Sequence, residues 1–307
     1  MCKKIIISLL SIIVICFASS ESDKSLSDIT RSDSLDQVIL DYTKQIELNP
    51  TDYVAYKDRG NCYLTKKDYE RAMADYNKSI EINPKYANPY NNRGLVYRDQ
   101  GEYQKALAEF DKAIELDSLL YQAYQNRGLL LKDNLKEPLS ALRDFGKTIQ
   151  LNPTGPYAYY YRGQAYEHLS MSDSAIADFS KAIELHPKFT SAYNERGVAY
   201  VKNYYYQLAT ADFEKTIELD STFPHPYINL GVIAIEKMNY DKAITYCTKA
   251  LELDSTFGIA MYHLARAYEK KDNRAHAKFW YQKTQKYPER ISNKILSDIE
   301  AKIQELK

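Results

Sequence analysis

The sequence has no excess of charge of either sign, since its 307 residues carry 41 Lys and Arg against 41 Asp and Glu. No run of basic residues is longer than two, so nothing indicates binding to nucleic acid or to an anionic surface. Glycine is also scarce: of ten residues, six share one repeated position. The other four are scattered and cannot form a phosphate-binding loop.

The residue patterns of catalytic and metal sites are also missing. None of the five histidines forms an HxxxH pair, no cysteine forms a CxxC or CxxH motif, and there is no GxSxG sequence. Cys62 and Cys247 lie far apart in the chain, which argues against a disulfide between them. We therefore predict no metal, no cofactor, no small-molecule substrate and no enzymatic activity.

The N-terminal segment differs from the rest of the chain. Lys3 and Lys4 precede an apolar run that ends at Phe17 and is short for a membrane span. Small residues follow it, as at a signal-peptide cleavage site. We therefore expect an exported protein, periplasmic or extracellular. A retained anchor or lipidation at Cys16 stays open, and either would add membrane contact.

A short phrase recurs along the rest of the chain. It reads YKDRGNCY from Tyr56, YNNRGLVY from Tyr90 and YNERGVAY from Tyr193. Aligned on their small residue, the copies are 34 residues apart, except for one step of 35. A fixed period in this range is typical of a solenoid of stacked units. The aligned small residues are Gly60, Gly94, Gly128, Gly163, Gly197, Gly231 and Ala265.

Each unit contains two amphipathic stretches, which predict two helices per repeat. On the second stretch an alanine is followed four residues later by a larger residue, as with Ala106 and Phe110. Because the small residue of the first helix and the alanine of the second have little bulk, we expect the two helices to cross closely there. This packing accounts for a glycine inside a helix, where it otherwise costs about 1 kcal/mol.

These positions resemble the tetratricopeptide repeat family, whose pattern is aromatic-x2-Leu-Gly-x2-Tyr, then Ala-x3-Phe, Ala and Pro. The resemblance implies an all-α fold, a right-handed α-solenoid of about seven helix pairs. Residues 35–50 align with a second helix alone, and isoleucines recur every four positions after Pro288. The expected segments are a signal peptide (1–20), a disordered linker (21–34), an N-terminal half-repeat helix (35–52), seven repeats (53–86, 87–120, 121–155, 156–189, 190–223, 224–257 and 258–289) and a C-terminal capping helix (290–307).

An arginine precedes the glycine in five repeats, where the family usually has leucine. The second helix of these repeats carries an acidic residue, whereas the repeats with Leu230 and Leu264 have aromatic residues there. We therefore predict a ladder of structural ion pairs, favoured by the forked geometry of the guanidinium group. The alternative is a row of arginines that binds an anionic ligand. The predicted pairs are Arg59–Asp75, Arg93–Glu109, Arg127–Asp144, Arg162–Asp178 and Arg196–Asp212.

In tetratricopeptide solenoids the first helices line a concave groove that binds partner chains, so the resemblance implies a non-catalytic scaffold for a protein or peptide partner. Lys57, Asn61 and Asn92 match three places of the family's carboxylate clamp, but its other two basic places hold amides. The groove residues expected from this resemblance are Lys57, Asn61, Asn88, Asn91, Asn92, Gln122, Gln125, Asn126, Tyr157, Tyr160, Tyr161, Gln164, Asn194 and Asn229.

Two further functions stay open from the sequence. One is a self-associating structural component of an envelope assembly, and the other is a binder of neutral polysaccharide through tyrosine and amide side chains. For a protein partner, Tyr157, Tyr160 and Tyr161 are the expected contact patch, because tyrosine is common at interface hot spots. Tyr159 already occupies the packing position, so we expect these three rings to contribute little to stability.

Overall fold

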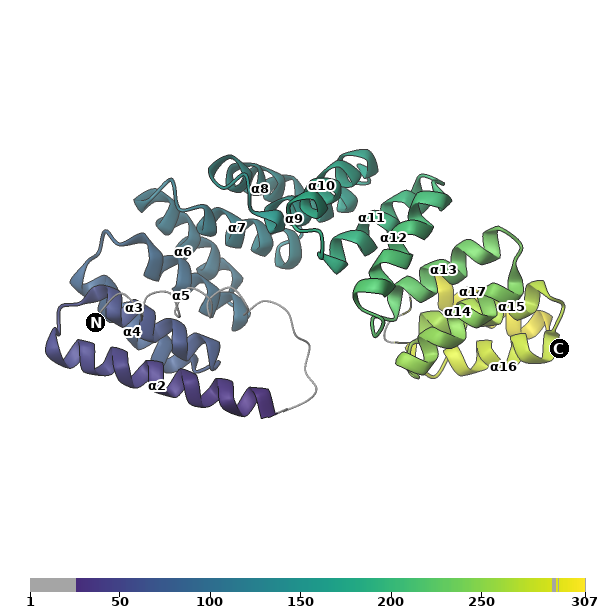
Figure 1. Ribbon diagram of the computed structural model, residues 1–307, viewed down its shortest axis with the longest axis horizontal. Helices are drawn as coiled ribbons and strands as arrows, with labels where there is room; N and C mark the ends of the chain where they lie inside the picture. Colours follow the sequence, from purple (N-terminus) through teal and green to yellow (C-terminus); the bar gives the residue numbers. More distant parts are fainter. Residues whose placement is uncertain (1–25, 289–290, 292, 307) are drawn as a thin grey trace. The chain divides into compact units, whose positions relative to one another are not determined.

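The computed structural model describes residues 26–288, 291 and 293–306, which form helices and no β-strand (Figure 1). The expected signal peptide and the first part of the expected linker lie outside the described residues. By their contacts, the residues divide into two compact units that meet between Glu137 and Pro138. The all-α prediction is confirmed.

The first unit contains a long N-terminal helix, two complete helix pairs and the first helix of the third repeat. Its elements are α2 (Leu26–Leu48), α3 (Tyr53–Thr65), α4 (Tyr69–Ile82), α5 (Ala87–Asp99), α6 (Tyr103–Leu116), α7 (Tyr121–Leu129) and the π-helix η1 (Leu130–Asn134). The second unit begins with the second helix of that repeat. Its elements are α8 (Pro138–Leu151), α9 (Pro156–His168), α10 (Ser172–Leu185), α11 (Thr190–Lys202), α12 (Tyr206–Leu219), α13 (His225–Glu236), α14 (Tyr240–Leu253), α15 (Gly258–Lys270), α16 (Arg274–Thr284) and α17 (Asn293–Glu305).

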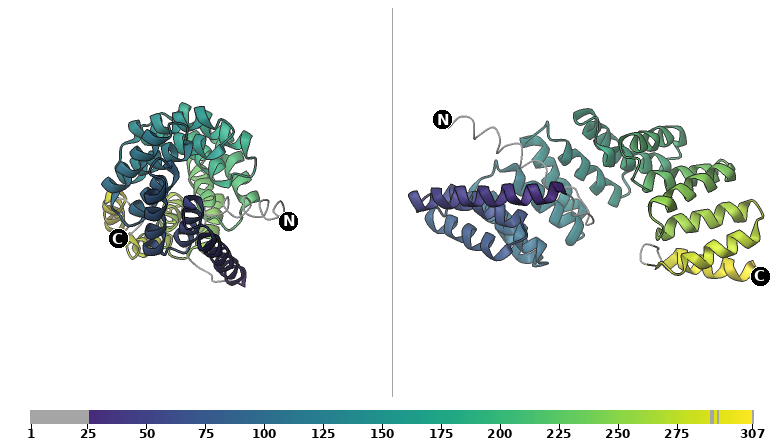
Figure 2. Two further views of the ribbon diagram at one scale, coloured as in Figure 1. Left: turned by 90° about the vertical axis from the view of Figure 1, so that its left-hand side faces the viewer. Right: turned by 60° about the horizontal axis from the view of Figure 1, so that its bottom comes forward.

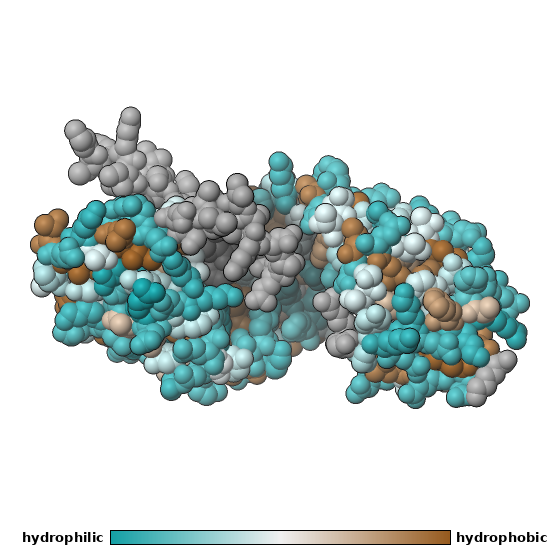
Figure 3. Space-filling view, turned by 90° about the horizontal axis from the view of Figure 1, so that it is seen from below, coloured by the Kyte–Doolittle hydropathy of each residue, from teal (hydrophilic) through white to brown (hydrophobic). Residues whose placement is uncertain are grey.

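Within each unit, every helix packs on the next one along the chain, as α3 does on α4 and α14 does on α15. The views in Figure 2 show α13 to α16 as neighbouring helices of this kind. Exposed apolar side chains form separate patches among polar residues on the face shown in Figure 3. The stacked helix pairs are those of an α-solenoid.

The N-terminal helix corrects the expected boundaries. The linker was expected to be disordered through residue 34, but α2 already begins at Leu26 and continues without a break to Leu48. The segment between these residues contains neither proline nor glycine, so nothing in it ends a helix. At the other end, α17 covers most of the expected capping segment.

The extra residue of the third repeat widens a helix turn. Leu130–Asn134 form a π-helix, in which the amide of Leu135 donates to the carbonyl of Leu130 at 3.0 Å. The amide of Glu137 then donates to the carbonyl of Leu131 at 2.8 Å. A π-turn takes up one additional residue without ending the helix, so the repeat pattern continues after it.

The repeated glycines lie directly against a large residue of the second helix. A Cβ atom on Gly94 would lie 2.7 Å from Phe110 Cε1, and one on Gly163 would lie 2.6 Å from Phe179 Cε1. Carbon atoms do not approach this closely without displacing one another. The rings are fully buried, so they cannot move into solvent. The glycine is therefore a steric requirement of these helix pairs, whereas the seventh repeat has Ala265 at this position.

The arginine ladder is present within both units. The guanidinium group of Arg196 donates from Nε and Nη2 to the two carboxylate oxygens of Asp212, at 2.8 and 2.7 Å. Arg59 with Asp75, and Arg162 with Asp178, have the same two-bond geometry. These aspartates are buried, so the arginines compensate their charge.

Two of the five predicted arginine–carboxylate pairs differ from that two-bond geometry. Arg93 reaches only Oε1 of Glu109, at 2.6 Å, because glutamate is one methylene longer than aspartate. Among the described residues, Arg93 Nε and Glu109 Oε2 are buried without a hydrogen-bond partner. Arg127 belongs to the first unit and Asp144 to the second. Their pairing stays a prediction.

Most of these arginines also contact the preceding repeat, which the sequence pattern did not reveal. Nη1 of Arg196 donates to Ser180 on α10 at 3.0 Å, sixteen residues earlier in the chain. The guanidinium group thus connects three helices. The corresponding contacts are Arg59–Thr43 (3.1 Å), Arg93–Asn77 (2.8 Å) and Arg127–Asp111 (2.5 Å). For Arg162 the corresponding position is Gly146, which offers no side chain.

Tyrosines complete the surroundings of the arginines. The guanidinium carbon of Arg93 lies 5.4 Å from the ring centre of Tyr90, and that of Arg196 lies 5.6 Å from Tyr193. The hydroxyl of Tyr90 donates to the carbonyl of Pro84 at 3.1 Å. One residue type thus gives the cation an aromatic face and closes the turn between repeats, which accounts for part of the high tyrosine content.

The ladder predicts that Arg196→Leu destabilises the protein by roughly 3–5 kcal/mol, because it leaves the carboxylate of Asp212 buried and unpaired. Adding Asp212→Tyr reproduces the Leu230 and Tyr246 of the sixth repeat and should recover most of the loss. Chemical denaturation of both variants measures this. A double variant no more stable than the single one contradicts the pairing.

The gap at Gly146 predicts a stabilising substitution. Nothing lies within 4 Å of the place where its Cβ would be, so Gly146→Ser fits and can accept a bond from Arg162, as Ser180 does from Arg196. Gly146→Ala is the matched control, since it gains only helix propensity, about 1 kcal/mol. Serine should be at least as stable as alanine, because the bond contributes roughly 0.5–1.5 kcal/mol and offsets a helix propensity roughly 0.5 kcal/mol lower than that of alanine. A serine variant that is less stable than the alanine variant by this propensity difference would show that no bond forms.

Candidate binding surface on the first helices

The groove residues expected from the sequence all lie on first helices. In the first unit they come from α3, α5 and α7, and in the second unit from α9, α11 and α13.

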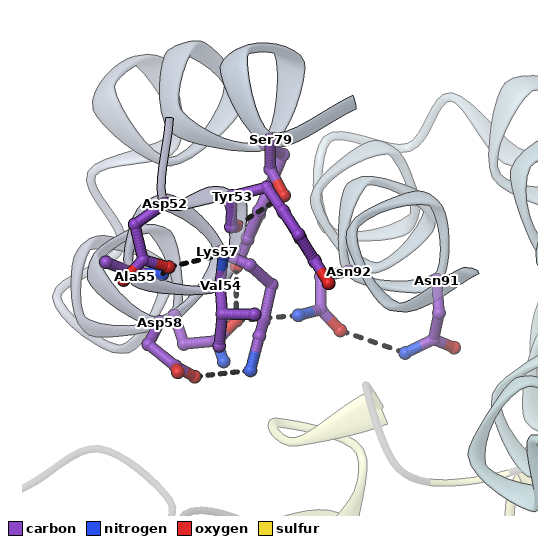
Figure 4. Close-up of polar contacts among 11 residues, drawn as sticks. Asp52, Tyr53, Val54, Ala55, Lys57, Asp58, Ser79, Asn91 and Asn92 are labelled. Carbon is purple, nitrogen blue, oxygen red and sulfur yellow. Dashed lines mark hydrogen bonds and ion pairs between the residues drawn. The ribbon is translucent and has the colours of Figure 1, made fainter. Parts of the chain in front are cut away.

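In the first unit four asparagines form a continuous chain of amide hydrogen bonds. Asn126 Nδ2 donates to Asn91 Oδ1 at 2.9 Å, and Asn91 Nδ2 donates to Asn92 Oδ1 at 2.9 Å. Asn92 Nδ2 then donates to Asn61 Oδ1 at 2.6 Å, so the chain joins α7, α5 and α3. Figure 4 shows Asn91 and Asn92 pointing toward each other. All the amides point the same way along the chain.

This arrangement changes the expected role of two residues. Asn91 and Asn126 were expected to face a partner, but they are only 6% and 9% exposed, and their amides bind each other. Asn61 and Asn92 remain half-buried. A side-chain amide has two N–H donors and two acceptor lone pairs, so these two retain bonding capacity. Asn91 and Asn126 hold the row in place rather than contact a partner.

The hydroxyl of Tyr76 supports the end of this chain and was missed from the sequence. It donates to Asn61 Oδ1 at 2.9 Å, from the second helix of the same repeat. The corresponding residue is phenylalanine in the next four repeats, at positions 110, 145, 179 and 213. That single change from Phe to Tyr was a signal available in the sequence.

Basic residues on this surface are neutralised by their neighbours in the chain. Lys57 binds Asp58, as Figure 4 also shows, and Arg98 Nη2 binds Asp99 at 2.8 Å. Lys132 likewise pairs with Asp133. Asn88 and Gln125 are half-buried on the same helices, and Gln122 is exposed. The surface therefore offers amides rather than a free positive charge.

In the second unit the first helices carry an aromatic cluster. The rings of Tyr157 and Tyr161 stack at 6.3 Å between centroids, and Tyr160 lies 5.5 Å from Tyr161. Phe189, the last residue of the same repeat and the N-cap of α11, contacts Tyr157 at 5.1 Å and Tyr160 at 4.8 Å. The sequence pattern had not included Phe189, because it precedes the first helix of the next repeat.

The three tyrosines are not equivalent, contrary to the expectation that none supports the core. Tyr160 packs 5.9 Å from Phe179, which fills the space beside Gly163, and its hydroxyl accepts a bond from Gln164 at 2.9 Å. Tyr161 lies 6.0 Å from Phe145. Tyr157, by contrast, is 45% exposed. Only Tyr157 is mainly available to a partner.

The amide row of the second unit is weaker. Asn229 Nδ2 is 3.5 Å from Asn194 Oδ1, and Asn194 is buried. The next first helix has His263 in the corresponding position. Among the described residues its Nδ1 is buried without a hydrogen-bond partner. Burial, with Arg266 nearby, lowers the pKa of His263 to about 3, so the ring is neutral at physiological pH.

The remaining reactive groups are in protected positions. Burial raises the pKa of the Cys62 thiol to about 11 and that of Cys247 to about 12, so both are protonated near neutral pH. Within the described ranges, no three His, Cys, Asp or Glu side chains are placed to hold a metal ion. In the same part of the chain, no helix combines the length and apolar composition needed to cross a membrane.

Comparison with known proteins gives matches at the level of the repeat and the fold. Residues 53–86, 87–118, 156–189 and 226–257 match the family model described as Tetratricopeptide repeat. A search of curated protein sequences gives no match. One similar solved structure is YrrB, described as a TPR protein with an unusual peptide-binding site, with 26% identity over 61% of this chain and 95% of YrrB and a TM-score of 0.53. A tetratricopeptide repeat protein from Parabacteroides merdae is 19% identical over 83% of this chain and 98% of its own, with a TM-score of 0.62. Cut9–Hcn1 of the APC/C is 20% identical over 76% of this chain and 46% of its own, with a TM-score of 0.64. The last two show the fold alone.

The aromatic cluster predicts different effects for its two outer rings. Tyr160→Ala removes contacts with Phe179 and Phe189 and should cost roughly 2–4 kcal/mol of unfolding free energy. Tyr157→Ala should cost less than about 1 kcal/mol, because the ring is largely exposed. Urea denaturation of both variants measures the difference. Equal losses would contradict the assignment of Tyr160 to the core.

Proposed function

Because the chain belongs to the tetratricopeptide repeat family, we propose that it is a non-catalytic scaffold that binds an extended segment of a partner protein along α3, α5 and α7. Proteins of this family generally bind protein or peptide partners and are generally not enzymes. YrrB, similar over 61% of this chain, is described as having a peptide-binding site. These similarities support a binding role.

The observation that carries the proposal is the polarised amide chain from Asn126 to Asn61. An extended peptide presents backbone N–H and C=O groups in alternation, and asparagine amides can pair with both. The chain holds Asn61 and Asn92 in fixed orientations before a partner arrives, which reduces the entropy lost on binding. Contacts of this kind recognise backbone rather than particular side chains.

The charges of the surface narrow the class of partner. Lys57, Arg98 and Lys132 each pair with the acidic residue that follows it. An anionic tail or a nucleic acid would have to compete with these carboxylates for the cations. A segment of mixed or low charge meets no such competition. Tyr157, in the second unit, supplies an additional exposed ring for a protein partner.

We place this binding outside the cytoplasm. The support for this part of the proposal is the sequence of residues 1–20, a charged start followed by an apolar run and small residues. That segment lies outside the described residues, so the export of the protein rests on sequence alone.

The test is capture of a partner with the wild-type protein, followed by calorimetric titration of the bound segment. Asn61→Ala combined with Asn92→Ala should weaken binding by roughly 1–3 kcal/mol, because both half-buried amides are lost. Gln104→Ala, which removes an exposed amide on the second helix α6, is the matched control and should bind as the wild type does. Melting curves verify that each variant is folded.

Three outcomes would contradict the proposal. Equal affinity of the double variant and the control would remove the amide row as the site. Concentration-dependent assembly in sedimentation, without any captured partner, would favour a self-associating structural component. Binding of neutral polysaccharides on a glycan array, lost with Tyr157→Ala, would favour a carbohydrate-binding role.

A further inference from the structure

The seventh repeat combines three departures that no other repeat combines, although the sixth shares the first two and the third lacks the glutamate of the last. The arginine of the ladder is Leu264, and its acidic partner is Trp280. The third difference concerns a lysine that recurs on the second helices and binds a glutamate three residues later. The recurring pairs are Lys78–Glu81 (2.7 Å), Lys112–Glu115 (2.9 Å), Lys181–Glu184 (2.6 Å), Lys215–Glu218 (2.5 Å) and Lys249–Glu252 (2.9 Å).

In the seventh repeat this pair becomes two lysines, Lys283 and Lys286. Without a carboxylate at the second position, the Lys283 ammonium group lies over the Trp280 ring, 4.7 Å from its centre. The helix α16 contains Arg274, Lys278 and Lys283 and no acidic residue. Every other second helix of the repeats has at least one Asp or Glu. The helix α16 by itself therefore carries an excess of positive charge.

A pocket of about 240 Å³ lies at the place of the missing arginine. Its lining includes Leu264, together with Thr248 and Trp280, which stand at the two positions that an arginine bridges in the earlier repeats. Leu251 of α14 adds a further apolar wall, and Ser255, Glu252 and Lys283 complete the lining. The carboxylate of Glu252 is paired with Lys249 at 2.9 Å. Leucine is shorter than arginine, so the space between α14 and α16 is left unfilled.

We propose that this pocket binds an acidic peptide segment of a partner protein, with one apolar side chain inserted beside Trp280 and flanking carboxylates on Lys283 and Lys286. The apolar side chain of such a segment would fill the volume that an arginine at position 264 would occupy. Its carboxylates would pair with Lys283, which has no glutamate three residues later. A cavity of about 150 Å³ already accepts benzene, so one leucine or phenylalanine side chain fits here.

The surroundings agree with this occupant. Phe279, next to Trp280, is 55% exposed and extends the apolar surface beside the pocket. Aromatic residues with basic neighbours are typical of interface hot spots. The site lies on α14, α15 and α16 of the second unit, whereas the amide row lies on α3, α5 and α7 of the first unit. It is therefore independent of the function proposed above.

The chain contains one tryptophan, Trp280, so its fluorescence reports directly on the pocket. The full chain is titrated with a short peptide of glutamates around one leucine, with selective excitation of tryptophan. We expect a saturable change in emission that weakens as salt is added. Peptides with alanine in place of leucine, or glutamine in place of glutamate, should bind at least tenfold more weakly.

Two variants rebuild features of the other repeats and should therefore fold. Lys286→Glu restores the lysine–glutamate pair, and Leu264→Arg with Trp280→Asp restores the ladder and fills the pocket. Each should weaken binding at least tenfold, measured by the fluorescence anisotropy of a dye-labelled peptide. Asn61→Ala with Asn92→Ala should leave this binding unchanged, which separates the two sites.

The proposal is overturned if the leucine peptide causes no saturable change, or if the rebuilt variants bind as the wild type does. Vesicles containing phosphatidylglycerol serve as a second probe. A change in Trp280 emission with these vesicles and not with the peptide would assign the face to an anionic lipid surface and overturn the assignment to a peptide.

Discussion

In five helix pairs, the close contact between a glycine of the first helix and a side chain of the second helix is the constraint on which the rest of the structure depends. A ring edge occupies the place of the missing Cβ in four repeats, at 2.6–2.7 Å from where that atom would be. This contact sets the distance and rotation of each helix pair. The arginine before the glycine consequently points toward the second helices and binds the carboxylate there, as Arg196 binds Asp212.

The structure separates its two polar systems by helix. Arginines on the first helices reach second helices of two successive repeats, so they join neighbouring repeats as well as the two helices of one repeat. The asparagines join first helices only, through amides. The first system compensates buried charge, whereas the second leaves half-buried amides at a surface. The ion pairs and the candidate binding surface therefore use different residues of the same short phrase.

Tyrosine is used both for packing inside the repeats and for the exposed surface. Tyr90 and Tyr193 lie under arginines and close turns, and Tyr160 packs into the core. Tyr157 has the same chemistry but remains largely exposed. The rings of Tyr157 and Tyr160 both contact Phe189, and the difference is that Tyr160 also packs on the buried Phe179. Exposure, rather than residue type, marks the tyrosine that is available to a partner.

The sequence alone determined the repeat, its two helices and the glycine contact. The reason is that the same apolar pattern and the same small residue recur at a fixed period in seven repeats. It also determined four arginine–carboxylate pairs that lie within the units. Only the tertiary structure decided how exposed each asparagine is, that the arginines reach Thr43, Asn77, Asp111 and Ser180, and that a pocket replaces the arginine at Leu264. These features depend on distances between helices of different repeats. A pattern within one repeat does not contain them.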